Sequence, residues 1–350
     1  MNGNRSSFGV RRAPFCVLRS ACEPERRTSH GARRTANAER RTKNPERRGL
    51  VPAAALVALV ATLLFAAVVI GAGQSGGSPA ARRAGPPESV RLYVFDCGTL
   101  ERADMGRYRL KNEEVATIRM SVACFLVAHP KGTLMWDVGA VPDAAWKPTG
   151  APLAQRVVLP DSQTREVTMV RPLNAQLAEA GYSPADITHV AFSHYHWDHT
   201  ANGNAFAGST WLVRQVERDA MFPQKPTPLT QPSDYAALRT SKTITIKTDE
   251  HDVFGDGTVV LKLAPGHTPG HQVLYVKLRK NGGVVLSGDL YHYPEERTLG
   301  RVPTFEFNQE QTGATRAAID SFLKKVGAQL WIQHDFAANA KLKKAPSYYD

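Results

Sequence analysis

Cysteine is scarce in this chain of 350 residues, which contains only four. Two lie near the N-terminus, and Cys97 and Cys124 lie in the body of the chain. No pair has C-x-x-C spacing, and two body cysteines are too few for a disulfide framework. Cys97 and Cys124 each fall in an expected strand, so two interpretations stay open. They form a single disulfide if the body is exported, or they are two buried thiols.

Acidic residues are scarce in residues 1–49, where thirteen Lys and Arg stand against four Asp and Glu. This segment carries +9 of the formal net charge of +12. It has little hydrophobic periodicity, so we expect a disordered tail. Aromatic residues do not alternate with the basic ones, so nucleic-acid binding through base stacking is not expected. A second interpretation is that translation begins further downstream and that this segment is not part of the protein.

Charged side chains are absent from residues 50–73, which are apolar almost throughout. About 20 apolar residues can span a bilayer, and Arg47 and Arg48 just before them favour a cytoplasmic N-terminus. We expect a signal peptide or a signal anchor, so that the rest of the chain is periplasmic, secreted or anchored outside the cytoplasmic membrane. Residues 74–89 are rich in Gly, Ser, Pro and Ala, which predicts a flexible linker before a folded domain at 90–350.

Six consecutive residues, 194–199, read H-x-H-x-D-H and carry four side chains that can bind metal ions. Imidazole nitrogens and carboxylate oxygens are ligands of zinc and similar ions. In an extended backbone, residues i and i+2 point the same way, so His194 and His196 can hold one ion together. Asp198 and His199 must then project elsewhere, which suits a second ion close by.

Three single candidate ligands follow further along the chain, namely His267, Asp289 and His334. Each comes shortly after an apolar, β-branched run that is typical of a buried strand. These runs span 259–263, 284–286 and 330–332. Functional side chains are common where strands end in loops. Five His and two Asp provide three ligands per ion and one bridging carboxylate, whereas a single zinc site needs only three or four ligands.

The rest of the chain predicts a mixture of strands and helices. Further strands are expected at 90–95, 115–129, 134–137, 188–192 and 211–213, and in a second sheet at 244–246 and 272–278. A stretch rich in Pro and Ala at 140–160 predicts a long loop. Apolar residues at helical spacing predict a helix at 309–326.

The order H-x-H-x-D-H, single His, single Asp and single His resembles the metallo-β-lactamase superfamily over roughly residues 90–350. The stretches 92–98, 266–271 and 333–335 are similar to the N-acyl-homoserine lactonases of that superfamily. The resemblance implies an α/β fold, a four-layer αββα sandwich, behind the N-terminal apolar segment. It also implies that Asp137, in Trp136-Asp137-Val138-Gly139, supports the metal loop without binding metal. Asp96 is the alternative for that role.

The same resemblance implies a metal-dependent hydrolase with two divalent ions, which we expect to be zinc. The first ion would be bound by His194, His196 and His267, the second by Asp198, His199 and His334, and Asp289 would bridge the two. Asp198 would also relay a proton during hydrolysis.

The oxyanion donor departs from the family pattern, which places a Tyr three residues after the bridging Asp. That position is His292 here, between Tyr291 and Tyr293. Because alternate residues of an extended loop face the same way, we predict that both tyrosines face the site and that His292 faces away. Tyr291 is therefore the expected donor, and His292 is the second candidate.

The resemblance implies a hydrolase that opens the small-molecule lactone ring of N-acyl-homoserine lactones and so quenches a diffusible signal. The alternatives are an organophosphate hydrolase, a thioesterase or a β-lactamase of the same fold. β-Lactamases place Cys or Ser at the position of Asp289, and the 16 residues after His334 are too few for the helical domain of glyoxalase-II-like thioesterases. A non-catalytic, membrane-tethered binding protein would lack one or more of the ligands. Oligomeric state and acyl-chain preference do not follow from the sequence.

Overall fold

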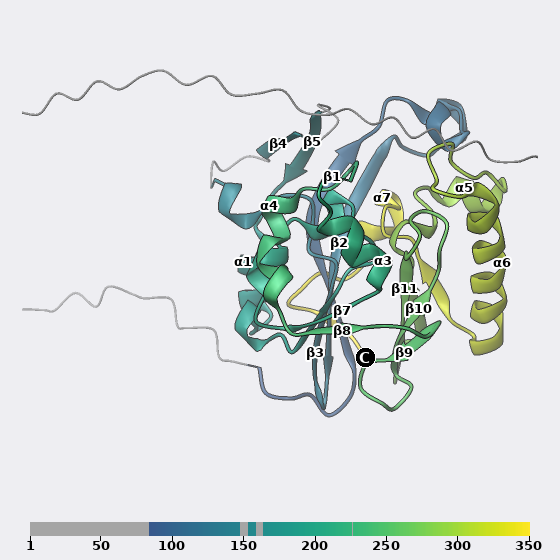
Figure 1. Cartoon of the computed structure of the whole chain (residues 1–350). Helices are drawn as coiled ribbons and strands as arrows, with labels where there is room; N and C mark the ends of the chain where they lie inside the picture. The colour runs from purple at the N-terminus through teal and green to yellow at the C-terminus, as the bar shows by residue number, and fades with distance from the viewer. Residues whose placement is uncertain (1–83, 148–152, 159–163, 226) are drawn as a thin grey trace, which may run out of the picture. The chain divides into compact units, whose positions relative to one another are not determined.

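The computed structural model describes residues 84–147, 153–158, 164–225 and 227–350 (Figure 1). The predicted tail, the apolar segment at 50–73 and most of the predicted linker lie outside these residues. Within the described ranges, no helix is both long enough and apolar enough to cross a membrane.

The larger of the two sheets is a mixed sheet built mainly from the first half of the described chain. In spatial order its strands are β4 (Leu153–Val158), β5 (Thr164–Met169), β1 (Arg91–Glu101), β2 (Arg119–His129), β3 (Gly132–Trp136), β6 (His189–Ala191), β7 (Thr210–Val213) and β8 (Thr243–Thr245), and β14 (Tyr348–Tyr349) pairs with β1. Strands β3, β6, β7 and β8 pair in parallel, and the other pairs are antiparallel. Two of the sequence-based predictions are wrong. The strand predicted at 244–246 in the second sheet is β8 of this sheet, and β4 lies within 140–160, which was predicted to be a loop.

The smaller sheet comes from the second half of the chain. Its strands, in spatial order, are β13 (Gln329–Trp331), β12 (Gly282–Leu286), β11 (Gln272–Leu278), β10 (Val259–Leu263) and β9 (Glu250–Asp252). Only β12 and β13 pair in parallel. The three strands β10, β12 and β13 each end shortly before one of the predicted single ligands, as expected from their apolar runs.

Helices cover the outer faces of the two sheets (Figure 1). The α-helices are α1 (Leu173–Glu179), α2 (Trp197–Thr200), α3 (Gln215–Met221), α4 (Pro232–Tyr235), α5 (Pro294–Thr298), α6 (Gln309–Val326) and α7 (Phe336–Asn339). Short 3-10 helices are η1 (Met105–Tyr108), η2 (Asn112–Glu114), η3 (Asp143–Ala145), η4 (Pro184–Asp186), η5 (Gly203–Phe206), η6 (Ala236–Thr240) and η7 (Gly288–Leu290). Helix α6 has the predicted bounds. It begins at the Asn308 cap and ends at Gly327, whose left-handed backbone favours glycine.

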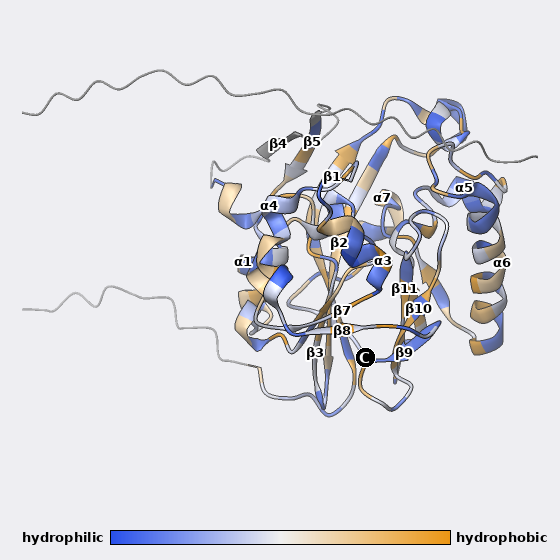
Figure 2. Cartoon of the chain, viewed as in Figure 1, coloured by the Kyte–Doolittle hydropathy of each residue, from blue (hydrophilic) through white to orange (hydrophobic). Residues whose placement is uncertain are grey.

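The described residues form three apolar clusters between the layers. The central one lies between the sheets and takes alternate residues of several strands, such as Leu92 and Val94 of β1. A second cluster joins the outer face of the larger sheet to Leu173 and Leu177 of α1. The third joins the smaller sheet to the apolar residues of α6, which alternate with polar ones along that helix in Figure 2. The result is the expected αββα order of layers.

Cys97 of β1 and Cys124 of β2 form a disulfide. The pairing of these strands shifts register between Asp96 and Thr99, so Cys97 lies at a β-bulge. The bond lies beneath the turn at Gly139, where an added Cβ would lie 3.0 Å from the Cβ of Cys97. Of the two interpretations left open by the sequence, the structure selects the disulfide.

Candidate metal centre

The segment after β6, a loop that leads into α2, carries the H-x-H-x-D-H residues and is held from behind by Asp137. One carboxylate oxygen of Asp137 accepts the backbone N–H of Ser193 at 2.6 Å, and the other lies 2.9 Å from Nδ1 of His199. Asp137 is fully buried and has a left-handed backbone with φ of 51°, which is uncommon for a residue other than glycine. The predicted supporting role of Asp137 is confirmed. Asp96, the alternative, is exposed and accepts the N–H of Gly98 instead.

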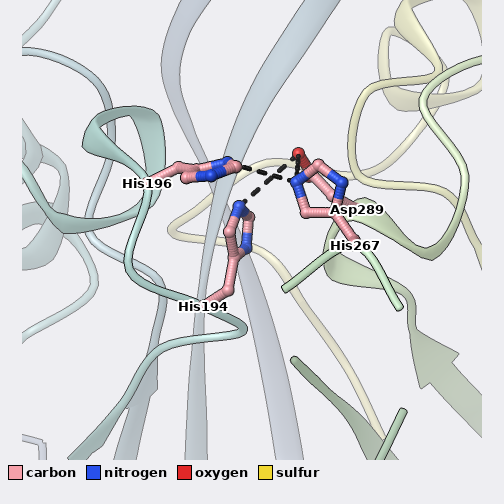
Figure 3. Close-up of side chains that lie close together, drawn as sticks. All are labelled: His194, His196, His267 and Asp289. Carbon is pink, nitrogen blue, oxygen red and sulfur yellow. Dashed lines mark hydrogen bonds and ion pairs between the residues drawn. The ribbon is translucent and has the colours of Figure 1, made fainter. Parts of the chain in front are cut away.

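The first group of candidate ligands is His194, His196, His267 and Asp289, whose ligand atoms all lie within 4.8 Å of one another. Figure 3 shows the three imidazoles and the carboxylate converging on one point. Nε2 of His267 lies 3.3 Å from Oδ2 of Asp289, and Nε2 of His194 lies 3.7 Å from the same oxygen. The segments that follow β10 and β12 of the smaller sheet therefore meet the segment that follows β6 of the larger sheet.

The second group is Asp198, His199 and His334. Nε2 of His199 and Nε2 of His334 lie 3.1 Å and 3.0 Å from Oδ1 of Asp289. Asp289 thus directs one carboxylate oxygen to each group, which is the arrangement of a bridging ligand. All seven predicted ligands are brought together in the predicted grouping.

Several ligand atoms are buried and have no hydrogen-bond partner among the described residues. They are Nε2 of His194, Nε2 of His199, Nε2 of His334 and Oδ1 of Asp289. A buried polar atom without a partner is costly in a folded protein. Metal ions coordinated by these atoms would remove that cost, so the donor set fits two divalent ions.

The opposite ring nitrogens of the histidines have partners that fix the orientation of each ring. Nδ1 of His267 lies 3.1 Å from Oε1 of Glu306, and Nδ1 of His334 donates to the Ser121 carbonyl at 2.7 Å. The Glu306 carboxylate is buried and also accepts the hydroxyl of Thr312 at 2.9 Å. Glu306 was not predicted from the sequence, because a single Glu in an irregular stretch has no distinguishing spacing.

The protonation of the histidines follows from burial and neighbouring charges. Burial and the adjacent histidines hold the pKa of His194 and His196 well below the ordinary value, which keeps both imidazoles in the neutral, metal-binding form. Burial has the same tendency at His267, but Glu306 and Asp289 outweigh it and raise the pKa of His267 to about 9. Metal binding at neutral pH must therefore displace a proton from His267.

A second buried carboxylate, Glu217 of α3, joins the two ligand loops. Its Oε2 accepts the N–H of Tyr195 at 3.0 Å, between the first two ligands. Its Oε1 accepts the hydroxyl of Thr268 and the N–H of Gly270, both at 2.7 Å. Burial raises the pKa of Glu217 to about 7, although these hydrogen bonds oppose the shift.

The predicted orientation of the residues after Asp289 is wrong. Tyr291 turns away from the site into the cluster under α6, where the guanidinium of Arg316 lies 4.1 Å from its ring centre. His292 faces the site instead, with Nε2 at 3.3 Å from Oδ2 of Asp289. Tyr293 also faces away, and its hydroxyl donates to the Ile118 carbonyl at 3.2 Å. The reason is that packing against α6 sets the direction of Tyr291, which local alternation cannot reveal.

His292 is itself held by a buried ion pair. Its Nδ1 lies 3.3 Å from Oε1 of Glu296, and Oε2 of Glu296 accepts a hydrogen bond from Arg316 at 2.5 Å. Burial disfavours a charged imidazole, but Glu296 and Asp289 raise the pKa of His292 well above the ordinary value. Arg316 also donates to the carbonyls of Leu290 and Arg301, so α6 fixes the whole segment after Asp289.

A cavity leads to the two ligand groups. Its walls near the ligands include Asp198, His292 and the aromatic side chains of Tyr108, Trp197 and Phe305. Four of its lining residues are shared with an outer cavity of about 520 Å³. Asp198 and His292 therefore line the cavity together with the candidate ligands, next to the outer cavity.

Comparisons with known proteins identify the superfamily of this chain. The metallo-beta-lactamase superfamily matches residues 117–331, more than half of the chain. The N-acyl homoserine lactonase AttM of Azorhizobium caulinodans is 29% identical over 269 residues, covering 75% of this chain and 99% of that protein. The N-acyl homoserine lactonase AiiA of Bacillus thuringiensis subsp. kurstaki is 25% identical over 234 residues, covering 66% of this chain and 88% of that protein.

Solved structures show the same fold. An N-acyl homoserine lactone hydrolase with N-hexanoyl-L-homoserine at its catalytic metal centre has a TM-score of 0.59 and 22% identity, covering 74% of this chain and 99% of that one. AidC, described as a dizinc quorum-quenching lactonase, has a TM-score of 0.53 and 17% identity, with 77% and 96% covered. Together with the superfamily match, the fold shows that this chain is a metal-dependent hydrolase that belongs to the metallo-beta-lactamase superfamily.

Proposed function

We propose that this protein opens the lactone ring of N-acyl-homoserine lactones at a two-metal centre and so quenches a diffusible signal. The observation that carries the proposal is the position of Asp289, which directs one carboxylate oxygen to each of two complete ligand groups. The curated relatives named N-acyl homoserine lactonase support the substrate class, since their alignments cover almost their whole length.

The residues that would hold the metals are the seven predicted ones. His194, His196 and His267 would hold the first ion, and Asp198, His199 and His334 would hold the second. Asp289 directs one carboxylate oxygen to each group. Two bound zinc ions would supply a Lewis acid at the lactone carbonyl and a water whose pKa is lowered to about 7.

The protein side chains would complete the hydrolysis. Water adds to the carbonyl carbon, the ring C–O bond breaks, and the products are an alcohol, a carboxylate and one proton released to solvent. Asp198 lines the cavity and is placed to carry the proton of the water to the leaving oxygen. We assign the contact with the developing oxyanion to His292, because Tyr291 faces away from the cavity.

A hydrolysis panel tests this function. Zinc-loaded protein is assayed with N-hexanoyl-homoserine lactone, a β-lactam, a glutathione thioester and a phosphotriester, with metal content measured on the same sample. The Asp289→Ala variant, prepared in parallel, reports any contaminating activity. We expect the lactone to have the highest kcat/KM. A higher kcat/KM for the phosphotriester or the thioester would replace the lactonase with one of the alternative hydrolases, and no turnover of any substrate would favour a binding protein.

A further inference from the structure

Arginine side chains line the passage between the outer cavity and the candidate metal centre. Arg102 follows the end of β1, Arg107 lies on η1, and Arg165 lies on β5. These three residues and Tyr108 line both the outer and the inner cavity, so the two cavities are adjacent and these side chains lie between them. Any substrate group that extends from the metal centre towards solvent must pass these guanidinium groups.

We propose that this passage is an anion subsite, which selects substrates carrying a carboxylate on the part that is not hydrolysed. The proposal rests on the proposed lactonase function and specifies it further: the substrate class becomes homoserine lactones with an anionic acyl chain. The subsite is formed by Arg102 and Arg107, with Tyr108 between the two cavities.

The charges near the two arginines support this assignment. Nε of Arg102 is buried and has no hydrogen-bond partner among the residues that the structure describes. The guanidinium of Arg107 lies 5.0 Å from the ring centre of Phe305, and neither arginine belongs to an ion pair within the described ranges. Arg165 has another partner, so we assign anion binding to the first two.

The carboxylates near the passage do not neutralise the positive charges of Arg102 and Arg107. Among the residues that the structure describes, the only acidic ones that line the inner cavity are Asp198 and Asp289, which belong to the candidate ligand groups. Three others, Glu101, Asp104 and Glu166, line the outer cavity alone. Glu101 lies 3.4 Å from Arg119, and Asp104 accepts the N–H of Gly106. Glu166 likewise has another partner.

The physical consequence is a preference for negative charge. An unsubstituted acyl chain in the passage would remove water from the guanidinium groups without replacing its hydrogen bonds, which costs free energy. A carboxylate would replace those hydrogen bonds with charge-assisted ones, for which the planar guanidinium is well suited. The outer cavity, at about 520 Å³, has the size of ordinary ligand sites.

Matched substrates test the proposal. Zinc-loaded protein is assayed with homoserine lactones whose six-carbon acyl chain ends in a carboxylate or in the isosteric amide. We expect kcat/KM to be about tenfold higher for the carboxylate, and the ratio should fall with added salt. In Arg102→Gln and Arg107→Gln the ratio should approach one, and circular dichroism and bound zinc measured on the same samples should match the wild type, which shows that the variants are folded. Arg109→Gln is the control, because Arg109 lies beside η1, bonds to Gln309 and lines neither cavity.

A binding experiment separates failure of the subsite from failure of the lactonase function. Calorimetry on the zinc-loaded protein compares adipate with hexanoate, which share one carboxylate and differ in the second. We expect adipate to bind about tenfold more tightly, with the difference lost in Arg102→Gln and Arg107→Gln. If adipate binds more tightly in this way but no lactone is hydrolysed, the anion subsite is supported and the lactonase function is contradicted. Equal affinities, or a carboxylate preference that survives in both variants, would overturn the subsite.

Discussion

At the scale of a single residue, Asp289 links the two ligand groups, because each of its carboxylate oxygens faces one group. We expect about two divalent ions per chain, and Asp289→Ala should lower that content and abolish hydrolysis, since each ion depends on every ligand that holds it. Metal content is measured by inductively coupled plasma mass spectrometry beside kcat on a lactone. Asp219→Ala, which changes an exposed Asp of α3, should keep both metal and activity. Full activity in Asp289→Ala after loss of one ion would exclude the bridged two-metal mechanism.

His292 and Tyr291 provide a matched pair for the oxyanion contact. Removing one donor to an oxyanion typically lowers kcat by about 10²–10³. The metals would share this charge, so we expect His292→Ala to lose about 10²-fold or less, and Tyr291→Phe to lose almost nothing. Both variants should retain their metal, measured on the samples used for kinetics. Loss of metal in His292→Ala would make His292 a ligand, and a larger kcat loss in Tyr291→Phe would return the role to the tyrosine.

The seven candidate ligands could be predicted from sequence because their spacing is local or because each follows an apolar strand. The supporting carboxylates could not. Glu306 and Glu217 lie in stretches with no recurring spacing, and only the folded chain brings them to the ligand loops. The direction of Tyr291 was mispredicted for a similar reason, since Arg316 lies 25 residues further along the chain and is brought beside it by α6.

At the scale of secondary structure, α3 connects the two ligand loops through Glu217. A carboxyl group whose folded pKa is raised from 4.5 to about 7 contributes stability below pH 4.5 and loses that contribution as the pH rises to about 7. Between these values the free energy of unfolding of the wild type should fall by up to about 3 kcal/mol relative to Glu217→Gln, which does not titrate. Urea unfolding at several pH values measures the difference. Glu113→Gln, at an exposed position, should follow the wild type, and parallel profiles for Glu217→Gln and wild type would contradict the prediction.

At this scale, the positions of strands could be predicted from the sequence better than the way the strands pair. The apolar runs located β10, β11 and β12 well, because such runs mark buried strands wherever they pair. They could not show that β8 adds to the edge of the larger sheet beside β7, since that choice depends on contacts distant in sequence. The strand β4 was missed because the surrounding Pro and Ala residues obscured it, and its pairing with β5 is a tertiary property.

At the scale of the whole molecule, we propose that the catalytic domain is exported. The disulfide between Cys97 and Cys124 supports this, because disulfides persist mainly outside the cytoplasm. We expect protein from the native cell to carry the intact disulfide. Its N-terminus should lie between residues 71 and 85, or the chain should stay in the membrane fraction through residues 50–70. N-terminal sequencing and thiol alkylation with mass spectrometry check both. Full-length protein with free thiols in the cytoplasm would contradict the proposal.

The candidate ligands follow strands of both sheets. Four lie in the segment after β6, which includes α2, and three lie in the segments that follow β10, β12 and β13. Two ions bound by these ligands would cross-link the two sheets at one end of the sandwich, and chelation would remove that cross-link. The central apolar cluster joins the layers along their length, so chelation should leave the layers stacked but let that end open. Backbone amides beside the ligand loops would then exchange with solvent faster, while those deep in β2 and β11 would exchange as before. If the domain is exported as we propose, the supply of zinc outside the cytoplasm would affect how quickly proteases attack its catalytic end.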